Sequence, residues 1–196
     1  MSLDNYKITV PPAMAPVKLC DVKEWCRVTH TSEDVLFAAL IDSAVAKAEL
    51  YTNRAFINRT LTGDFSHLDC SRYEKGYFFE LRRAPLSTLT SVTVMVSDVV
   101  TTISSDEYNL KEDSGFSRIV FEEVNDSPDR VPYPYQVTFV AGYGANSDAV
   151  PAPIKMAINE AVCYWYQNRG DCDGATELPP IAKGILGEYR ILNTYG

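Results

Sequence analysis

The chain is poor in the residues on which active sites and metal sites usually depend. It has only two histidines, His30 and His67, among 196 residues. Its five cysteines stand at positions 20, 26, 70, 163 and 172, an odd number with no C-x-x-C pair. Zinc sites and disulfide frameworks need paired cysteines, and a lone histidine without a positioned partner is a weak indication of catalysis. We therefore expect no catalytic, metal or cofactor site, and a reducing compartment.

Long apolar runs are absent as well. No stretch of the sequence approaches the ~18–20 consecutive apolar residues that a membrane-spanning helix needs. The first residues lack a basic start followed by an apolar core, so they do not resemble a signal peptide. These two features predict a protein without membrane contact.

Basic residues are outnumbered by acidic ones. The chain has 18 Lys and Arg against 26 Asp and Glu, which gives a formal net charge of −8. Proteins that grip nucleic acid usually carry a basic patch that releases counterions from the phosphates. The charge balance therefore disfavours tight DNA binding, although it allows an acidic surface past which DNA can slide.

Helical periodicity occurs at both ends of the chain, and an alternation of period two occupies the middle. We predict helices over residues 19–28, 31–54, 153–169 and 179–192, and strands over residues 59–65, 77–81, 91–96, 119–122 and 136–141. The fold class is therefore α+β. We expect one domain over residues 1–196, in which residues 17–54 and 153–192 form a bundle of two N-terminal and two C-terminal helices. Residues 56–141 would be an antiparallel β region inserted into that bundle.

The second predicted helix has a start motif and a broad apolar stripe. Thr31-x-x-Asp34 is a loose version of a capping box. The apolar stripe is wide enough to pack against more than one neighbour. It consists of Leu36, Leu40, Ala44, Ala48 and Tyr51 and is widened by Val35, Phe37, Ile41 and Val45.

The two C-terminal helices carry a further expectation each. Trp165 falls on the apolar face of the third helix, so its neighbour Tyr164 must be exposed or meet a partner. Gly184 and Gly187 weaken the last helix by roughly 1 kcal/mol each relative to alanine. That helix should need a partner to be fully ordered.

Two short motifs hint at chemistry and fail. Gly142-x-Gly144 resembles the start of a phosphate loop, but position 147 is serine where the third glycine would stand. Residues 169–174 resemble part of a calcium loop, but the first and last ligand positions fall on Arg169 and Pro180. Neither motif predicts a binding site.

The most informative segment runs from Gln136 to Arg169. A strand stops at Gly142-Tyr143-Gly144, and Val150-Pro151-Ala152-Pro153 precedes a helix that ends in Trp165-Tyr166-Gln167-Asn168-Arg169. Earlier landmarks are Ala15-Pro16-Val17-Lys18-Leu19 and Arg83-Ala84-Pro85-Leu86. With these motifs the chain resembles the head-tail connector proteins, also called head completion or adaptor proteins, of long-tailed phages, prophages and gene transfer agents. Lys18 departs from the pattern, because a Ser or Thr helix cap would be expected there.

The resemblance implies a non-enzymatic structural protein of the virion, present in the host cytoplasm before assembly. Such proteins form a ring, typically of twelve subunits, beneath the portal protein. The ring extends the DNA channel, through which DNA passes without specific binding, and it docks the next tail or stopper (neck) protein. The resemblance also implies a subunit that can be monomeric in isolation and assembles on the portal. Another phage neck or tail-completion subunit is the nearest alternative.

Residues at the end of the β region and in the C-terminal helices are the candidate interface. Exposed tyrosines and arginines are favoured where proteins meet. The candidates are Tyr143, Tyr164, Tyr166, Ile185, Tyr189 and Arg190.

Acidic residues of the β region leave a different class of function open. Asp106, Glu107, Glu122 and Glu123 can be assigned to a small carboxylate-based enzyme or a ligand-binding domain. Solvated loop and edge-strand charges are the simpler interpretation. A deep pocket with two close carboxylates would support the enzyme, and a surface for self-contact would support the connector.

Overall fold

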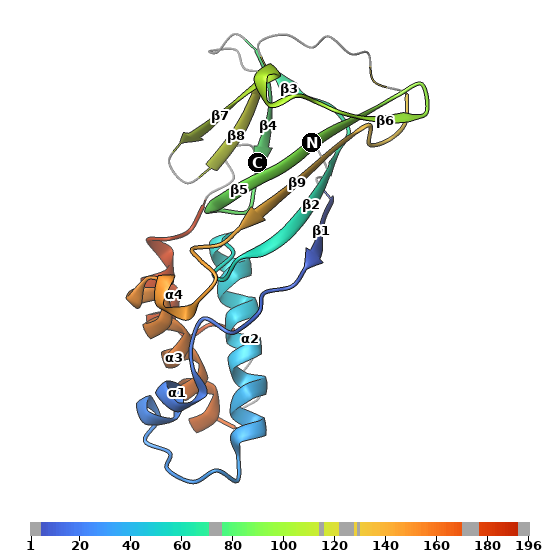
Figure 1. Ribbon diagram of the computed structural model, residues 1–196. Coiled ribbons are helices and arrows are strands. Elements are labelled where there is room, and N and C mark those ends of the chain that lie inside the picture. Colours follow the sequence, from blue (N-terminus) through green and yellow to red (C-terminus); the bar gives the residue numbers. More distant parts are fainter. Residues whose placement is uncertain are drawn as a thin grey trace. The chain divides into compact units, whose positions relative to one another are not determined.

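The computed structural model describes residues 5–70, 76–113, 116–121, 128, 130–169 and 177–191 (Figure 1). These residues form four α-helices and nine strands, and every strand pair is antiparallel. The chain divides into two compact units, one of residues 1–11 and 58–142 and the other of residues 12–57 and 143–196. The fold is α+β, as predicted.

The first unit, hereafter the β unit, contains a sheet of five strands. Their order is β1 (Asn5–Val10), β2 (Arg59–Phe65), β9 (Tyr135–Ala141), β5 (Leu86–Val96) and β6 (Val99–Thr102). The predicted alternation of the central strand β9 is confirmed, since Val137 and Phe139 are buried and Gln136 is exposed. Both neighbours pair with β9 over most of its length, which fixes its register.

The β unit also holds a sheet of four strands. Their order is β3 (Asp69–Cys70), β4 (Tyr77–Leu81), β8 (Phe116–Phe121) and β7 (Tyr108–Asp113). Aromatic side chains join the two sheets around Phe79, whose ring centroid lies 4.7 Å from Phe65 and 5.2 Å from Tyr135. Such offset and edge-on aromatic pairs add to the stabilisation that burial alone supplies.

The second unit, hereafter the helical unit, consists of α1 (Leu19–Trp25), α2 (Asp34–Thr52), α3 (Ala152–Gln167) and α4 (Pro180–Gly187). Helix α3 contacts each of the other three helices. Its inward face is fully buried at Ile154, Ala157, Ala161 and Val162, and Ile158 is 1% exposed. This face is the apolar stripe that the helical spacing predicts.

Local sequence explains where the helices begin and end. Pro151 and Pro153 flank the first residue of α3, where the missing N–H groups cost no helical hydrogen bond. Helix α2 ends at Asn53, which adopts a left-handed conformation with φ of 56°. Asparagine tolerates this conformation better than most residues, so it closes the helix.

The start of α2 differs from the sequence-based expectation. The helix begins at Asp34 after an N-cap residue, Glu33, that makes no side-chain cap bond. The capping box at Thr31 was therefore wrong, because the Asp34 N–H binds the Thr31 backbone carbonyl at 3.3 Å instead. The Asp34 carboxylate accepts a 2.5 Å bond from the Lys23 ammonium of α1.

The buried face of α2 is rotated within the predicted broad stripe: Ala44 and Ala48 are buried as expected, but the flanking Phe37 and Ile41 are also buried and the flanking Val35 is exposed. Leu36 and Leu40 lie at the margin of the core. The whole helix is apolar enough that sequence alone did not distinguish the two stripes.

Four strands were missed, and several helices are shorter than predicted. Strands β1, β3, β6 and β7 lie beside a single partner each, at an edge of their sheet. All of β6 is exposed, so no alternation marks it in the sequence. Edge strands depend on the partner strand rather than on their own pattern. Residue 192, the predicted end of the last helix, and residues 170–174, the predicted linker, lie outside the described residues.

Candidate functional site

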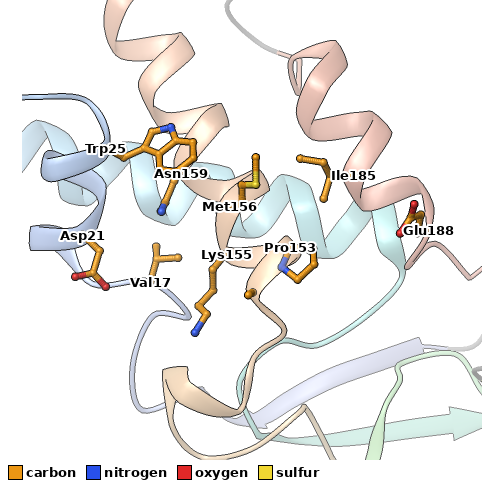
Figure 2. A pocket seen from close by; sticks show the side chains of 10 residues that line it. Val17, Asp21, Trp25, Pro153, Lys155, Met156, Asn159, Ile185 and Glu188 are labelled. Carbon is orange, nitrogen blue, oxygen red and sulfur yellow. The ribbon is translucent and has the colours of Figure 1, made fainter.

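A groove on the helical unit presents an accessible apolar surface (Figure 2). The volume of the groove is about 660 Å³. Its lining comes from α1, α3, α4 and the segment before α1: Val17, Asp21, Trp25, Ala152, Pro153, Lys155, Met156, Asn159, Ile185 and Glu188. Trp25 is 44% exposed and Met156 is 45% exposed. Open apolar pockets rimmed by polar groups are typical of binding surfaces.

The same helices that bury the core direct these side chains into the groove. Helix α1 buries Val22 completely, and this leaves Trp25 on its flank. On α3, Met156 precedes the fully buried Ala157 and therefore points away from the core. Ile185 of α4 is partly buried and completes the apolar lining.

Chemically, the groove suits apolar contact better than catalysis. Its charged groups are Asp21, Glu188 and Lys155, and its lining includes no histidine, cysteine or serine. The Lys155 ammonium lies 3.4 Å from the backbone carbonyl oxygen of Ser147. The arrangement can receive apolar side chains of a partner and one acidic group beside Lys155.

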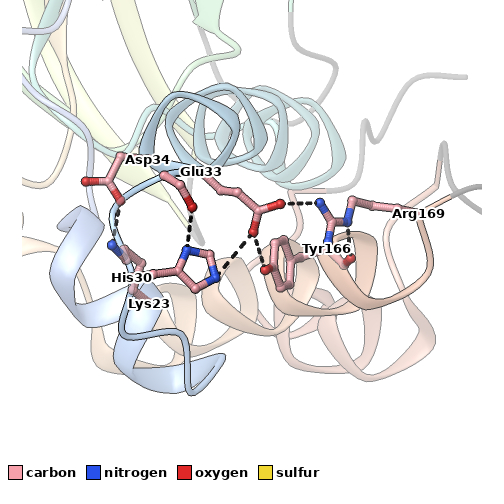
Figure 3. A network of polar contacts seen from close by, with 7 residues as sticks. Lys23, His30, Glu33, Asp34, Tyr166 and Arg169 are labelled. Atoms are coloured by element: carbon pink, nitrogen blue, oxygen red, sulfur yellow. Dashed lines mark hydrogen bonds and ion pairs between the residues drawn. The ribbon is translucent and has the colours of Figure 1, made fainter.

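A polar network centred on Glu33 joins the start of α2 to the end of α3 (Figure 3). The Tyr166 hydroxyl donates to Glu33 Oε2 at 2.5 Å, and the Arg169 guanidinium donates to Glu33 Oε1 at 2.7 Å. The same guanidinium lies 4.3 Å from the centre of the Tyr166 ring. His30 Nε2 is 3.7 Å from Glu33 Oε2. The hydrogen bond from Tyr166, and then that from Arg169, lower the pKa of the Glu33 carboxyl.

A Glu33→Gln variant is expected to be less stable than the wild type at neutral pH and nearly equal to it in acid. Because the folded-state pKa of Glu33 is lowered from 4.5, its ionised form stabilises the fold above that value. This contribution is lost as the pH falls through the lowered pKa. Urea unfolding at about pH 7 and about pH 3 measures the difference.

Glu24→Gln is the matched control for this prediction. Glu24 is exposed on α1, so its substitution should change the free energy of unfolding little at either pH. If Glu33→Gln destabilised the protein equally at both pH values, the network would not act through the charge of Glu33.

Burial makes the Cys26 thiol a poor nucleophile. Cys20, Cys26 and Cys163 are free thiols. Burial, followed by a hydrogen bond with Cys163, raises the pKa of Cys26 to about 12. A thiol with such a pKa stays protonated, and the thiolate is the nucleophilic form.

The structure separates the predicted interface residues into two groups. Tyr143, Tyr166 and Tyr189 are partly buried and pack against the helical core. Burial raises the pKa of Tyr143, and the Arg54 side chain lies near both Tyr143 and the Tyr189 backbone, to which it donates at 2.6 Å. These three tyrosines therefore have structural contacts within the chain.

Of the other predicted interface residues, Tyr164 and Arg190 are exposed, and Ile185 is partly buried against the helical core. Tyr164 is 37% exposed, Ile185 lines the groove, and the exposed Arg190 lies 5.0 Å from the centre of the Tyr51 ring. Their role as an interface remains a prediction. Trp25 and Met156 of the groove were not predicted as interface residues. Met156 could have been found, because it is an apolar residue on the polar side of α3.

The residues considered for catalysis that the structure describes each have their own local surroundings. His30 belongs to the Glu33 network, and His67 Nδ1 is 2.9 Å from the Ser66 hydroxyl. Asp106 and Glu107 are exposed in a short 3-10 helix, and the Glu107 carboxylate accepts a bond from the Ser104 N–H. Glu122 and Glu123 lie outside the described residues. Within the described part of the chain, no three His, Cys, Asp or Glu side chains gather as metal ligands would.

Among the described helices, none has the length and apolar character needed to span a membrane.

Comparison with known proteins gives one family and one group of similar structures. Residues 16–137 match the family described as phage gp6-like head-tail connector protein. A chain from the neck of an empty GTA particle, with C6 symmetry, has a TM-score of 0.77 at 20% identity over 98% of both chains. A chain from the virion of the native gene transfer agent (GTA) particle has a TM-score of 0.71 at 20% identity, covering 97% of both. A chain from the neck of the native GTA particle, with C12 symmetry, has a TM-score of 0.69 at 22% identity over 99% of this chain and 98% of that one. No curated protein sequence matches significantly.

Proposed function

The chain belongs to the phage gp6-like head-tail connector family, and from this premise we propose that it forms a ring beneath the portal protein. The family match over residues 16–137 is the observation that carries the proposal. The fold, shared over nearly the whole length of chains from GTA necks, supports it. The protein is a structural connector of the virion, and its proposed role involves no catalysis.

The proposed ring contains twelve subunits, extends the DNA channel and presents a docking surface for the tail or stopper protein. Twelve subunits agree with the C12 symmetry of one similar neck structure. In this proposal the four helices act as a bundle around α3, and the β unit is an insertion into that bundle. The subunit is present in the host cytoplasm before it joins the virion.

DNA passes through the proposed ring without specific binding. The net charge of −8 per subunit opposes the phosphate contacts that hold duplex DNA on a protein. A channel wall that bound phosphates would slow a chain that has to pass at full length. Accordingly, the free protein should show no micromolar affinity for random duplex DNA even at low salt.

Mixing the purified chain with the portal protein of the same particle tests the proposal. We expect the free subunit to sediment as a monomer or small species and the mixture to form a ring of twelve on the portal, visible by electron microscopy. A template that fixes neighbouring subunits allows many weak contacts to act together.

A chain that binds a tail-side component but leaves the portal bare would indicate another neck or tail-completion subunit. A chain that binds neither the portal protein nor a tail-side component would contradict the proposed connector role. The portal-binding assay thus separates the two structural functions.

A further inference from the structure

Helix α2 has a second apolar face, which its own chain leaves uncovered. The outer face of α2 consists of Val35, Ala39, Asp42, Ser43, Ala46 and Leu50, all of them exposed. Val35 is 86% exposed and Leu50 is 69% exposed, the two highest values among the exposed large hydrophobic side chains of the described residues. A surface helix usually presents charged and polar residues on the side away from the core. The outer face of α2 carries a single charge, at Asp42.

The centre of this face is suited to close packing. Ala39, Ser43 and Ala46 have small side chains, so another element can approach the helix axis closely between the larger Val35 and Leu50. The opposite side of α2 packs into the core of the helical unit, since Phe37, Ala44 and Ala48 are fully buried. An apolar helix surface of this kind is typical of an element covered in the assembled state.

The groove provides the complementary surface. Its apolar lining includes the half-exposed Trp25 and Met156. Like the outer face of α2, these side chains are typical of a surface that a partner covers in the assembled state. Lys155 is the only basic residue of the groove, and Asp42 is the only charged residue of the outer face of α2. The two surfaces therefore match in apolar character, and Lys155 offers Asp42 a partner of opposite charge in a groove that also carries the acidic Asp21 and Glu188.

The two surfaces cannot meet within one copy. No residue of α2 lines the groove. Seen from the groove, α2 lies behind α3 and α4 (Figure 2). Helix α2 contacts α1, α3 and α4 through its buried side, so its outer face points away from the helices that line the groove. A contact between them must join two copies through different faces. Such heterologous contacts generate closed rings when the rotation closes.

We propose that copies of this chain associate head to tail, with the outer face of α2 of one copy seated in the groove of the next. This inference rests on the proposed ring and names the subunit contact that builds it. The C6 and C12 symmetries of the similar neck structures require a contact of this heterologous type in those particles.

Cross-linking between copies tests the proposed pair of faces. Cys20 is exposed, and its sulfur lies 3.3 Å from Oδ1 of Asp21 at the groove rim. In a Ser43→Cys variant, a short bismaleimide should join the introduced thiol to Cys20 of the next copy. Cys70 and Cys172 are changed to serine in the background. We expect a ladder of covalent oligomers in the portal-bound ring and covalent dimers in concentrated free protein, both abolished by Cys20→Ser.

Charge insertion provides an independent measurement. Ala39→Glu on α2 and Met156→Glu in the groove should each prevent ring formation while leaving the folded monomer intact. Val100→Glu is the matched control, because Val100 is 62% exposed on β6 of the other unit. It adds the same charge at an exposed apolar position and should leave the ring unchanged.

Each outcome decides the inference separately from the proposed function. If rings form but give no ladder of cross-linked oligomers, the subunit contact lies elsewhere. The same holds if only Val100→Glu prevents ring formation. Either result overturns the inference while the connector role stands. Cross-links that persist in Cys20→Ser join the introduced thiol to a site other than the groove rim and overturn the inference as well. If portal binding fails but concentrated free protein yields the Cys20-dependent dimers, the head-to-tail contact stands and the portal role does not. Absence of the cross-link in both samples rejects the contact.

Discussion

Replacement of Trp165 by alanine is expected to destabilise the helical unit by ~3–5 kcal/mol, the range for large core truncations. Trp165 is 6% exposed and belongs to the same core as Ile158 and Val162. Its indole Nε1–H donates to the backbone carbonyl of Glu177 at 3.0 Å, which ties the segment before α4 to α3. The variant loses the packing of the ring and leaves that carbonyl without its donor. Because whole domains have ~5–15 kcal/mol of stability, this loss is a large fraction of the total.

Urea unfolding followed by far-UV circular dichroism measures this effect. Tyr164→Ala is the matched control, since Tyr164 is the neighbouring residue on α3 and is 37% exposed. The control should shift the midpoint far less than Trp165→Ala. A Trp165→Ala shift that corresponds to less than ~1 kcal/mol would place this ring outside the energetic core.

Replacement of Leu186 by alanine is expected to cost ~2–5 kcal/mol and to release α4 from the helical unit. Leu186 is fully buried, as is Ala182 one turn earlier, and both face the core shared with α3. Helix α4 has eight residues and contains Gly184, so it cannot be stable without this packing. The sequence predicted that this helix needs a partner, and the structure identifies that partner as α3 and α2 of the same chain.

Ile181→Ala is the matched control on the same helix. Ile181 is 60% exposed, so its truncation should change the free energy of unfolding by less than about 0.5 kcal/mol. Unfolding curves give the stability, and proteolysis of the segment after α4 reports its release. Equal effects of the two substitutions would mean that α4 does not depend on its buried face.

Much of the local structure could be predicted because it depends on short-range patterns. The alternation of β9 and the helical spacing of α3 each follow from residues within one element, and their buried faces were identified correctly. The two prolines around the first residue of α3 placed its start to within one residue. The family resemblance came from the same segment, because its turn and helix-start residues occur at characteristic spacings.

The candidate site was only partly predictable. Ile185 was identified as an interface residue and lines the groove, whereas Trp25 and Met156 were not. A groove is formed by three helices that are distant in sequence, so its lining cannot be found from the periodicity of any one of them. The rotated core stripe of α2 illustrates the same limit. Its two apolar faces are similar in the sequence, and only packing against α3 decides which one is buried.

The sequence by itself determined the order of the four helices and of strands β2, β4, β5, β8 and β9, the acidic balance and the family, because each depends on composition or on neighbouring residues. Only the tertiary structure decided that β1 pairs with β2 and that the strands divide into two sheets. It also brought Glu33 to Arg169 across 136 positions and left the outer face of α2 uncovered. These features depend on which distant segments meet, and that choice is made by the packing of the whole chain rather than by local preference.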